Sequence, residues 1–393
     1  MNSPAAPSRW SVVAAFTLVG AATQMVWLTY APVTTVAAQQ FGVSESAVGW
    51  LANIFPLAYV LLALPAGVLL DRYFRVAVVA GAVLTAAGAT VRLGGDSYAW
   101  ALVGQCLAAV GQPLVLNAIT GVAGRYLRPE DRPTGIAVGT ASTFAGMVVA
   151  FVLGAVFPEA SQLRTLVGVG AGFSVVAAVA VAVALRRPGE HRHTAAVRET
   201  GAVRTALGDP FVRTVGLLVF LPFGVFIALT TFGQALLEPA GVSSTTASLI
   251  LLAAVVAGVA GCAVLPVVAA RRGAELVTMS IGLTVSAAAC GLLAVVPGAL
   301  TGVVAMVVVG GLLLPLLPIV LELVARRTGE AEGTAAGLVW LSGNLGGLVV
   351  GLVVGLLVGQ PALAFALCAV LCLAAVPGVW RLRAYRSERE RVG

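Results

Sequence analysis

The sequence predicts an all-α membrane protein with twelve transmembrane helices in two six-helix bundles. Hydrophobic residues make up 60% of the 393 residues and charged residues only 10%. The mean hydropathy is +1.02, and no soluble domain of this length keeps so apolar a surface in water. Many apolar runs can cross a hydrocarbon core of about 30 Å as helices. A single long polar break divides these runs into six and six.

Twelve apolar runs are separated by charged residues or by Pro and Gly. They cover residues 10–38, 47–70, 76–94, 98–126, 132–157, 163–185, 211–237, 244–270, 274–296, 298–325, 332–358 and 360–382. The first run is too long for the apolar core of a signal peptide, so we interpret it as a retained helix. We predict an N-terminal bundle over 1–185, a linker over 186–210 and a C-terminal bundle over 211–393.

The distribution of arginine predicts the orientation in the membrane. All 23 basic residues are Arg, and 21 of them lie on the side that holds both termini and the linker. Only Arg92 and Arg164 lie on the other side. Because basic residues gather on the cytoplasmic side, we expect a multi-pass protein of the cytoplasmic (plasma) membrane with both termini cytoplasmic. The net charge of +7 then reflects topology, and we expect no nucleic-acid partner.

The two halves also resemble each other at a nearly constant offset. Gly42-Val43-Ser44 matches residues 241–243 at an offset of 199, and Arg72 matches Arg271 at the same offset. A glycine-rich run over 135–139 matches 333–337 at an offset of 198. Chance matches between small residues could explain one pair, but three pairs share almost one offset. Six helices per repeat predict parallel repeats related by a pseudo-two-fold axis along the membrane normal.

A charged motif ends the second apolar run. The segment 67–75 reads GVLLDRYFR, in which Gly67 permits close helix approach and Asp71 can face the positive N-terminus of another helix. It resembles the loop 2-3 signature of the major facilitator superfamily, G-x-L-x-D-R-x-G-R. It departs from that pattern at Phe74 and Val76, and the second-half copy carries Ala270 in place of the acid.

The resemblance implies a major-facilitator fold and a gate that closes the cytoplasmic side. In such a gate Asp71 contacts the start of the helix near residue 332 when that side is shut, so the contact biases an equilibrium between two states. A solvated loop charge is the alternative for this acid. The residues of the expected gate are Gly67, Asp71, Arg72, Arg75, Glu332 and Gly333.

Several further segments resemble the feline leukaemia virus subgroup C receptor-related family. They are residues 27–32, 41–51, 91–94, 103–105 and 330–338, together with Gln112. Members of that family are associated with choline and ethanolamine uptake and with haem export. The resemblance implies a choline cage that includes Trp27 and Gln112. A third cage residue, a tyrosine, falls near Thr230, and Phe226 and Phe232 are the aromatic residues close to it.

Other polar and aromatic residues inside the runs are candidates for a central cavity. A buried amide or indole needs a partner, which substrate or cavity water can supply. Interhelical hydrogen bonds and interface anchoring are the alternatives. The substrate-binding candidates are Trp27, Tyr30, Gln112, Asn117, Phe226, Thr230, Phe232 and Asn344.

The distribution of acids favours uncoupled transport. No run carries a carboxylate or histidine near its middle, where a proton relay needs one; Glu238 and Glu322 lie near helix ends. We therefore expect an alternating-access uniporter of a small organic solute, a choline-like amine. A proton-coupled multidrug or metabolite efflux antiporter is the alternative. A membrane receptor or sensor without transport is the alternative from another class, but no soluble signalling domain supports it.

Nothing in the sequence indicates catalysis or a resident cofactor. The five cysteines lie within apolar runs without a CxxC spacing, and no nucleophile-base pair or phosphate-binding loop is present. We expect no enzyme activity, no catalytic residues, no metal and no cofactor. The expected partners are a small-molecule solute and the lipid bilayer, and we expect a monomer.

Overall fold

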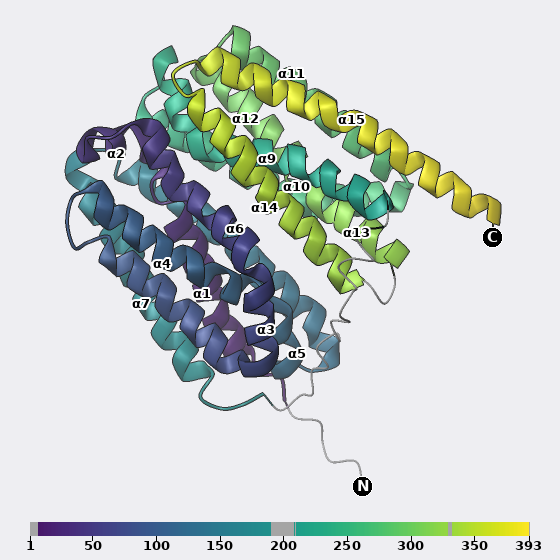
Figure 1. Cartoon of the computed structure of the whole chain (residues 1–393), viewed down its shortest axis with the longest axis horizontal. Helices are drawn as coiled ribbons and strands as arrows, with labels where there is room; N and C mark the ends of the chain where they lie inside the picture. The colour runs from purple at the N-terminus through teal and green to yellow at the C-terminus, as the bar shows by residue number, and fades with distance from the viewer. Residues whose placement is uncertain (1–6, 190–207, 209, 329–331, 393) are drawn as a thin grey trace. The chain divides into compact units, whose positions relative to one another are not determined.

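The computed structural model describes residues 7–189, 208, 210–328 and 332–392 (Figure 1). Every regular element in this part of the chain is an α-helix or a short 3-10 helix. The chain divides into two compact units, residues 1–197 and 198–393, and the boundary lies inside the expected linker. Each unit is described by itself.

The N-terminal unit follows the order of the first six apolar runs. Its elements are α1 (Trp10–Trp27), η1 (Ala31–Val33), α2 (Thr34–Phe41), α3 (Glu45–Val91), α4 (Tyr98–Leu116), α5 (Ile119–Tyr126), η2 (Pro129–Asp131), α6 (Arg132–Val156), η3 (Ala160–Gln162) and α7 (Leu163–Ala184). α1 packs against α3, α4, α6 and α7. The helix is buried on most sides for this reason.

The C-terminal unit repeats this arrangement. Its elements are α9 (Pro210–Leu237), η4 (Glu238–Ala240), α10 (Ser244–Arg272), α11 (Glu275–Val295), α12 (Ala299–Leu313), α13 (Leu316–Thr328), α14 (Glu332–Leu356) and α15 (Pro361–Val392). α9 packs against α10, α12, α13, α14 and α15. It therefore occupies the place in this unit that α1 occupies in the other.

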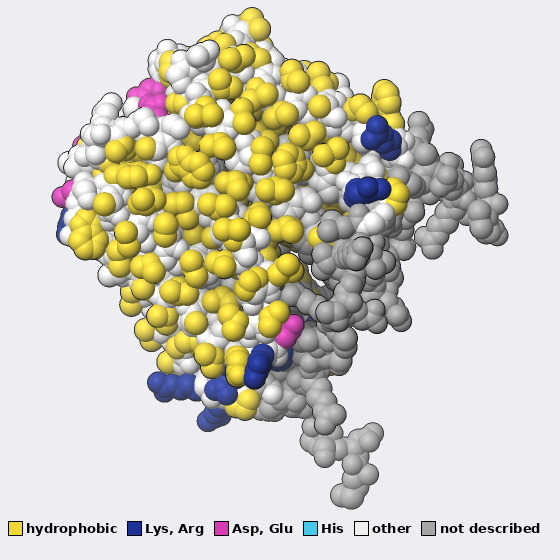
Figure 2. Space-filling view, in the orientation of Figure 1, with side chains coloured by type: hydrophobic (Ala, Val, Ile, Leu, Met, Phe, Trp, Pro, Cys, Tyr) yellow, Lys and Arg dark blue, Asp and Glu magenta, His cyan; other side chains and the backbone are white. Residues whose placement is uncertain are grey.

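The membrane spans confirm the fold class that the sequence predicts. The described residues contain 11 helical stretches long and apolar enough to cross a membrane. One of them, α3, has 47 residues and a non-helical backbone at Tyr73. Its length of about 70 Å allows two crossings, so the stretches account for the expected twelve. Figure 2 shows a face covered mostly by hydrophobic side chains, with the coloured charges near its margins.

The internal repeat is visible in the backbone as well as in the sequence. Gly42 and Gly241 both have the left-handed backbone that favours glycine, with φ of 66° and 77°. In each unit an extended serine follows two residues later and caps the next helix: Ser44 accepts from the Ala47 N–H, and Ser243 from the Thr246 N–H. A serine oxygen at this position satisfies one of the free N–H groups of the helix. The two Gly-Val-Ser segments thus make the same turn.

Close helix contacts repeat in the same way. A Cβ added at Gly146 of α6 would collide with the carbonyl of Ala21 in α1. In the other unit, a Cβ at Gly346 of α14 would collide with the carbonyl of Phe220 in α9. Small residues permit such backbone approach between helices in membranes. These contacts fix the central helix of each unit against its neighbour.

Candidate functional site

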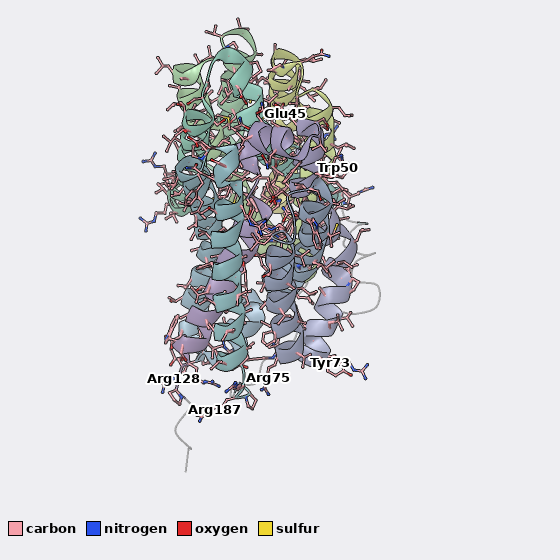
Figure 3. All side chains as sticks on the ribbon, turned by 90° about the vertical axis from the view of Figure 1, so that its left-hand side faces the viewer. Glu45, Trp50, Tyr73, Arg75, Arg128 and Arg187 are labelled. Atoms are coloured by element: carbon pink, nitrogen blue, oxygen red, sulfur yellow. The ribbon has the colours of Figure 1, made fainter. Side chains whose placement is uncertain are left out.

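Two ends of the N-terminal unit carry charged residues. Figure 3 places Tyr73, Arg75, Arg128 and Arg187 together at one end and Glu45 at the other. We call the first the Arg75 end. The second, which holds the α3–α4 turn and Arg92, we call the Arg92 end. About 24 Å of helix between residues 76 and 91 separates them.

At the Arg75 end, Arg75 caps the C-terminus of α7. The Arg75 Nε donates to the carbonyl of Leu185 at 2.6 Å, and its Nη2 donates to the carbonyl of Arg186. Arg9 donates to the carbonyls of Ala184 and Pro188, each at 3.2 Å. The last carbonyls of a helix have no partner within it and carry partial negative charge. These two arginines therefore stabilise the end of α7.

Phe74, where the superfamily motif has glycine, is accommodated by its neighbours. Its side chain is buried, and the Arg125 guanidinium carbon lies 4.0 Å from the centre of its ring. Gly121 of α5 faces the same ring, because a Cβ added there would collide with it. The departure from the motif thus fills the space that Gly121 leaves open.

Arg125 interacts electrostatically with Asp71, the acid of the charged motif. Arg125 lies on α5, beyond the candidate span that ends at Leu116. Burial lowers the pKa of its guanidinium, whereas the nearby charge of Asp71 raises that pKa. Asp71 itself is exposed, like Arg72 and Tyr73, so it is accessible to another charged or dipolar group.

The remaining gate residues give less information. Gly67 is buried within α3. Glu332 and Gly333 begin α14, and the Glu332 side chain lies outside the described part of the chain. The expected contact between Asp71 and the start of α14 stays a prediction.

Trp27 of the expected choline cage is held in one orientation. Its indole N–H donates to the carbonyl of Ala52 at 2.9 Å, and its ring centre lies 6.3 Å from that of Phe55 with the planes inclined at 33°. The side chain is half-buried. Gln112, the other expected cage residue, is buried in α4. The hydrogen bond leaves the faces of the indole ring, and not its N–H, for a ligand.

Asn117 has protein partners for its amide. Its oxygen accepts from the Tyr59 hydroxyl at 2.8 Å, and its nitrogen donates to the carbonyl of Ala63 at 3.0 Å. Both partners lie on α3, close to Pro65. Because a proline interrupts the hydrogen-bond ladder of its helix, the asparagine ties a weakened segment of α3 to the end of α4. This interhelical role is the alternative that the sequence left open for this residue.

Tyr30 lies beside a buried arginine at the Arg92 end. Arg92 is only 4% exposed, and its guanidinium carbon lies 5.7 Å from the centre of the Tyr30 ring. Its Nη1 donates to Thr29 Oγ1 at 3.1 Å and, more weakly, to Gln105 Oε1 at 3.4 Å. The sequence placed Arg92 as a charge at a membrane boundary and within the family-like segment 91–94. The available signals were its position near the end of the apolar run 76–94 and this resemblance, and neither predicts that the side chain turns inward.

Gln105 connects Arg92 to the backbone of Trp27. Its Nε2 donates to the carbonyl of Leu51 at 3.1 Å and weakly to the carbonyl of Trp27 at 3.5 Å, while its Oε1 accepts from Arg92. An amide that donates and accepts in this way fixes three helices relative to one another. The backbone beneath Trp27 is therefore supported by a buried polar network.

Three of the candidates of the C-terminal unit are buried on α9, and Asn344 is partly buried on α14. Phe226, Thr230 and Phe232 are each at most 2% exposed. The Thr230 hydroxyl donates to the carbonyl of Phe226 in its own helix at 2.9 Å, and the Phe232 ring faces Gly355 of α14. Asn344 donates to the carbonyl of Trp340 at 3.0 Å. These contacts are internal to the unit, and a substrate role for these residues stays a prediction.

Two similar units of long apolar helices, one with a charged motif at a helix break, are typical of a solute transporter of the membrane. Residues 13–351 match the model of the Major Facilitator Superfamily. The chain belongs to this superfamily, and it is a transporter rather than an enzyme.

Curated relatives agree with this assignment. The chain is 27% identical over 364 residues to solute carrier family 49 member A3 of Danio rerio, a match that covers 86% of this chain and 76% of the relative. It is 29% identical over 161 residues to the choline/ethanolamine transporter FLVCR1 of Felis catus, covering 40% of this chain and 29% of that protein. The match to the choline/ethanolamine transporter thus spans less than a third of that relative.

Solved structures show the same fold. A bacterial homologue of the human lysosomal transporter Spinster, inward-facing and unoccupied, superposes with a TM-score of 0.73 at 17% identity, covering 94% of this chain and 91% of that chain. A mutant form of the nucleoside transporter NupG gives a TM-score of 0.74 at 12% identity, covering 94% and 99%. The superfamily resemblance and the fold class expected from the sequence are confirmed.

Proposed function

We propose that this protein carries a small choline-like amine across the cytoplasmic membrane by alternating access, as a uniporter with both termini cytoplasmic. The observation that carries the proposal is the fixed indole of Trp27, whose N–H is occupied by the Ala52 carbonyl. A cation above an indole face gains up to about 2 kcal/mol when it is desolvated. The similarity to a choline/ethanolamine transporter supports the same substrate class.

The test is uptake of radiolabelled choline and ethanolamine into proteoliposomes that contain the purified chain. We expect saturable uptake without an imposed pH gradient, and about tenfold weaker apparent affinity in Trp27→Ala, since 1.4 kcal/mol corresponds to one factor of ten. Trp27→Phe should retain part of the affinity because it keeps an aromatic face. Trp380→Ala is the matched control, because Trp380 is 65% exposed. Equal uptake by all four proteins would remove Trp27 from the binding site.

One observation favours the proton-coupled antiporter. Glu275, at the first turn of α11, is only 3% exposed, and a buried carboxylate is a candidate proton carrier. The same liposomes decide between the two modes. Transport that requires a pH gradient and is abolished in Glu275→Gln would overturn the uniporter, whereas gradient-independent uptake by that variant would support it.

A further inference from the structure

Pro56 lies inside α3, four residues after the carbonyl group that accepts from the Trp27 indole. In an unbroken α-helix that carbonyl, which belongs to Ala52, would accept from the N–H of residue 56. Proline has no N–H, and its ring crowds the carbonyl four residues before it. Pro56 therefore deprives the Ala52 carbonyl of its usual partner in the helix. The indole N–H of Trp27 donates to this carbonyl at 2.9 Å.

This part of α3 needs hydrogen-bond donors from other helices because it is buried. Ala52 is 5% exposed, and Pro56 is also buried. A buried carbonyl without a donor is unfavourable. The carbonyl of the preceding residue, Leu51, accepts from Gln105 Nε2 at 3.1 Å. Two successive carbonyls of α3 thus accept from side chains of α1 and α4.

The internal repeat shows that the indole and the proline occur in the same unit. At the offset of 199, Trp27 corresponds to Phe226 and Pro56 corresponds to Val255. The ring of Phe226 has no N–H, and Val255 lies inside α10 with a backbone N–H that can complete the helix ladder. Both side chains are buried. The unit that lacks the indole donor therefore also lacks the proline that would expose an acceptor.

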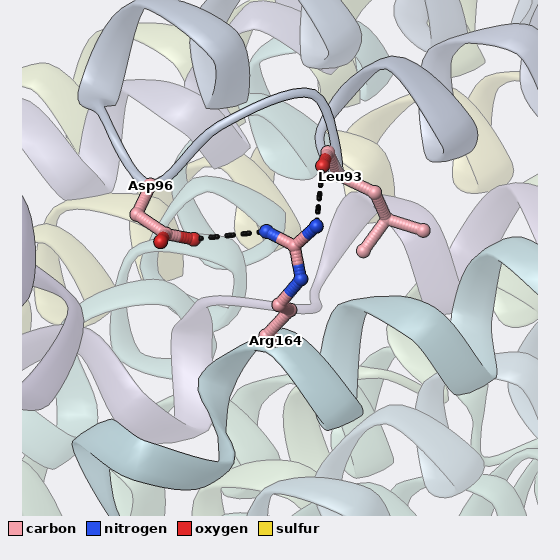
Figure 4. A network of polar contacts seen from close by, with 3 residues as sticks. All are labelled: Leu93, Asp96 and Arg164. Carbon is pink, nitrogen blue, oxygen red and sulfur yellow. Dashed lines mark hydrogen bonds and ion pairs between the residues drawn. The ribbon is translucent and has the colours of Figure 1, made fainter.

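The apolar surroundings of Trp27 hold its ring without setting its direction. Trp27 and Leu93 pack against one core cluster, which includes Phe55. The wall at Leu93 is held from outside, because its carbonyl accepts from Arg164 Nη2 at 3.1 Å and Arg164 Nη1 lies 3.3 Å from Asp96 Oδ1 (Figure 4). Apolar contacts are non-directional, whereas a hydrogen bond is directional. The hydrogen bond of the indole therefore sets the direction in which its ring faces point.

We propose that Pro56 is a positioning residue for cation binding, because it frees the carbonyl that orients the indole of Trp27. The inference rests on the proposed function, in which a face of this indole binds a choline-like amine. A cation is attracted to the face of an aromatic ring. A change in ring orientation therefore weakens binding even when the ring is still present. Pro56 acts through Trp27 and needs no contact with the substrate.

The test replaces the proline with alanine, which restores an N–H at residue 56. In Pro56→Ala this N–H competes for the Ala52 carbonyl, and the crowding by the proline ring is removed. We expect KM for choline uptake into proteoliposomes to rise about fivefold, with Vmax changed by less than about twofold. The Tm in detergent should stay the same or rise, because alanine favours a helix interior more than proline does. Choline uptake with an unchanged KM in Pro56→Ala would overturn the proposal.

A combined variant shows whether Pro56 acts through the indole. Phenylalanine has no N–H to orient, so Pro56→Ala should raise KM no further in a Trp27→Phe background. A second rise of the same size in that background would overturn the proposal, because the proline would then act independently of the indole. Pro65→Ala is the matched control. Pro65 also lies inside α3, but the carbonyl four residues before it belongs to Leu61, which is 65% exposed, so KM should match the wild type.

A spectroscopic measurement tests the positioning without any transport. The full-length protein is labelled with fluorotryptophan in detergent, and the fluorine NMR resonance of Trp27 is assigned by its absence from Trp27→Phe. We expect this resonance to shift or broaden in Pro56→Ala and to stay in place in Pro65→Ala. The same shift in a protein that does not transport choline would support the positioning of the indole and reject only the proposed substrate. A resonance unmoved in Pro56→Ala would overturn the inference even where choline is transported.

Discussion

Arginines at the two ends of the N-terminal unit lie in contrasting environments. At the Arg75 end, Arg75 is only half-buried and donates to two carbonyls of the α7 terminus. At the other end, Arg92 is almost completely buried, yet two of its three nitrogens have no acceptor. Burial alone would make Arg92 the more important for stability. The hydrogen bonds indicate the reverse, because Arg75 has two acceptors at the end of α7 whereas Nε and Nη2 of Arg92 have none.

The largest effect is expected from the residue that supports the Arg75 end. Phe74→Gly restores the superfamily glycine but removes a buried ring from between Gly121 and Arg125. Loss of a buried phenylalanine costs about 3–5 kcal/mol, so thermal unfolding in detergent should occur at a clearly lower temperature. Val76→Gly is the control, because Val76 is exposed and a glycine in an exposed helix costs about 1 kcal/mol. Equal losses in the two variants would show that only the helix backbone matters.

Arg75→Ala should have the next largest effect. The variant leaves the carbonyls of Leu185 and Arg186 without the arginine donors, and hydrogen bonds to charged groups contribute about 1.5–3 kcal/mol each when buried. We expect about 2 kcal/mol of lost stability, because the site is partly solvated. Arg72→Ala provides the matched comparison and should change stability by less than about 0.5 kcal/mol. If both arginines gave the same small loss, the cap on α7 would be unimportant.

Much of the structure at the Arg75 end could be predicted from the sequence. Long apolar runs and an abrupt charged segment indicate spans and a break, and the structure breaks α3 at Tyr73 as the motif suggests. The Gly-Val-Ser repeat likewise encodes its own turn, because a left-handed glycine and a capping serine act locally. The contact of Arg75 with α7 was not predictable, since its acceptors lie 110 residues away in the chain.

The Arg92 network was beyond prediction for the same reason. The partners of Arg92 are in the turn after α1 and on α4, and only their packing shows that the guanidinium turns inward. From the sequence, an arginine after an apolar run is an ordinary membrane-boundary charge. The roles of Asn117 and Trp27 also depend on long-range acceptors, the first on Tyr59 and the second on Ala52.

Asp71→Asn should affect transport more than stability. The exposed acid interacts with Arg125 through space, and exposed charge pairs contribute at most about 1 kcal/mol. If the acid closes a gate, its loss shifts the balance between two transporter states and slows uptake severalfold, while the protein still inserts into the membrane. Uptake into proteoliposomes measures this rate. Glu159→Gln, an exposed acid at the other end, should transport like the wild type, and a normal rate for Asp71→Asn would make Asp71 a solvated loop charge.

The smallest loss of stability is expected for a substitution of Arg92, although the burial of this residue would suggest the largest. Arg92→Gln should change stability by no more than about 1 kcal/mol. The variant loses the contacts of Nη1 with Thr29 and Gln105, but it also removes the unfavourable burial of a charge with two unpaired donors, and these effects oppose each other. Thermal unfolding beside Arg75→Ala measures the difference directly. A loss as large as that of Arg75→Ala would show that the existing hydrogen bonds of Arg92 outweigh the cost of its burial.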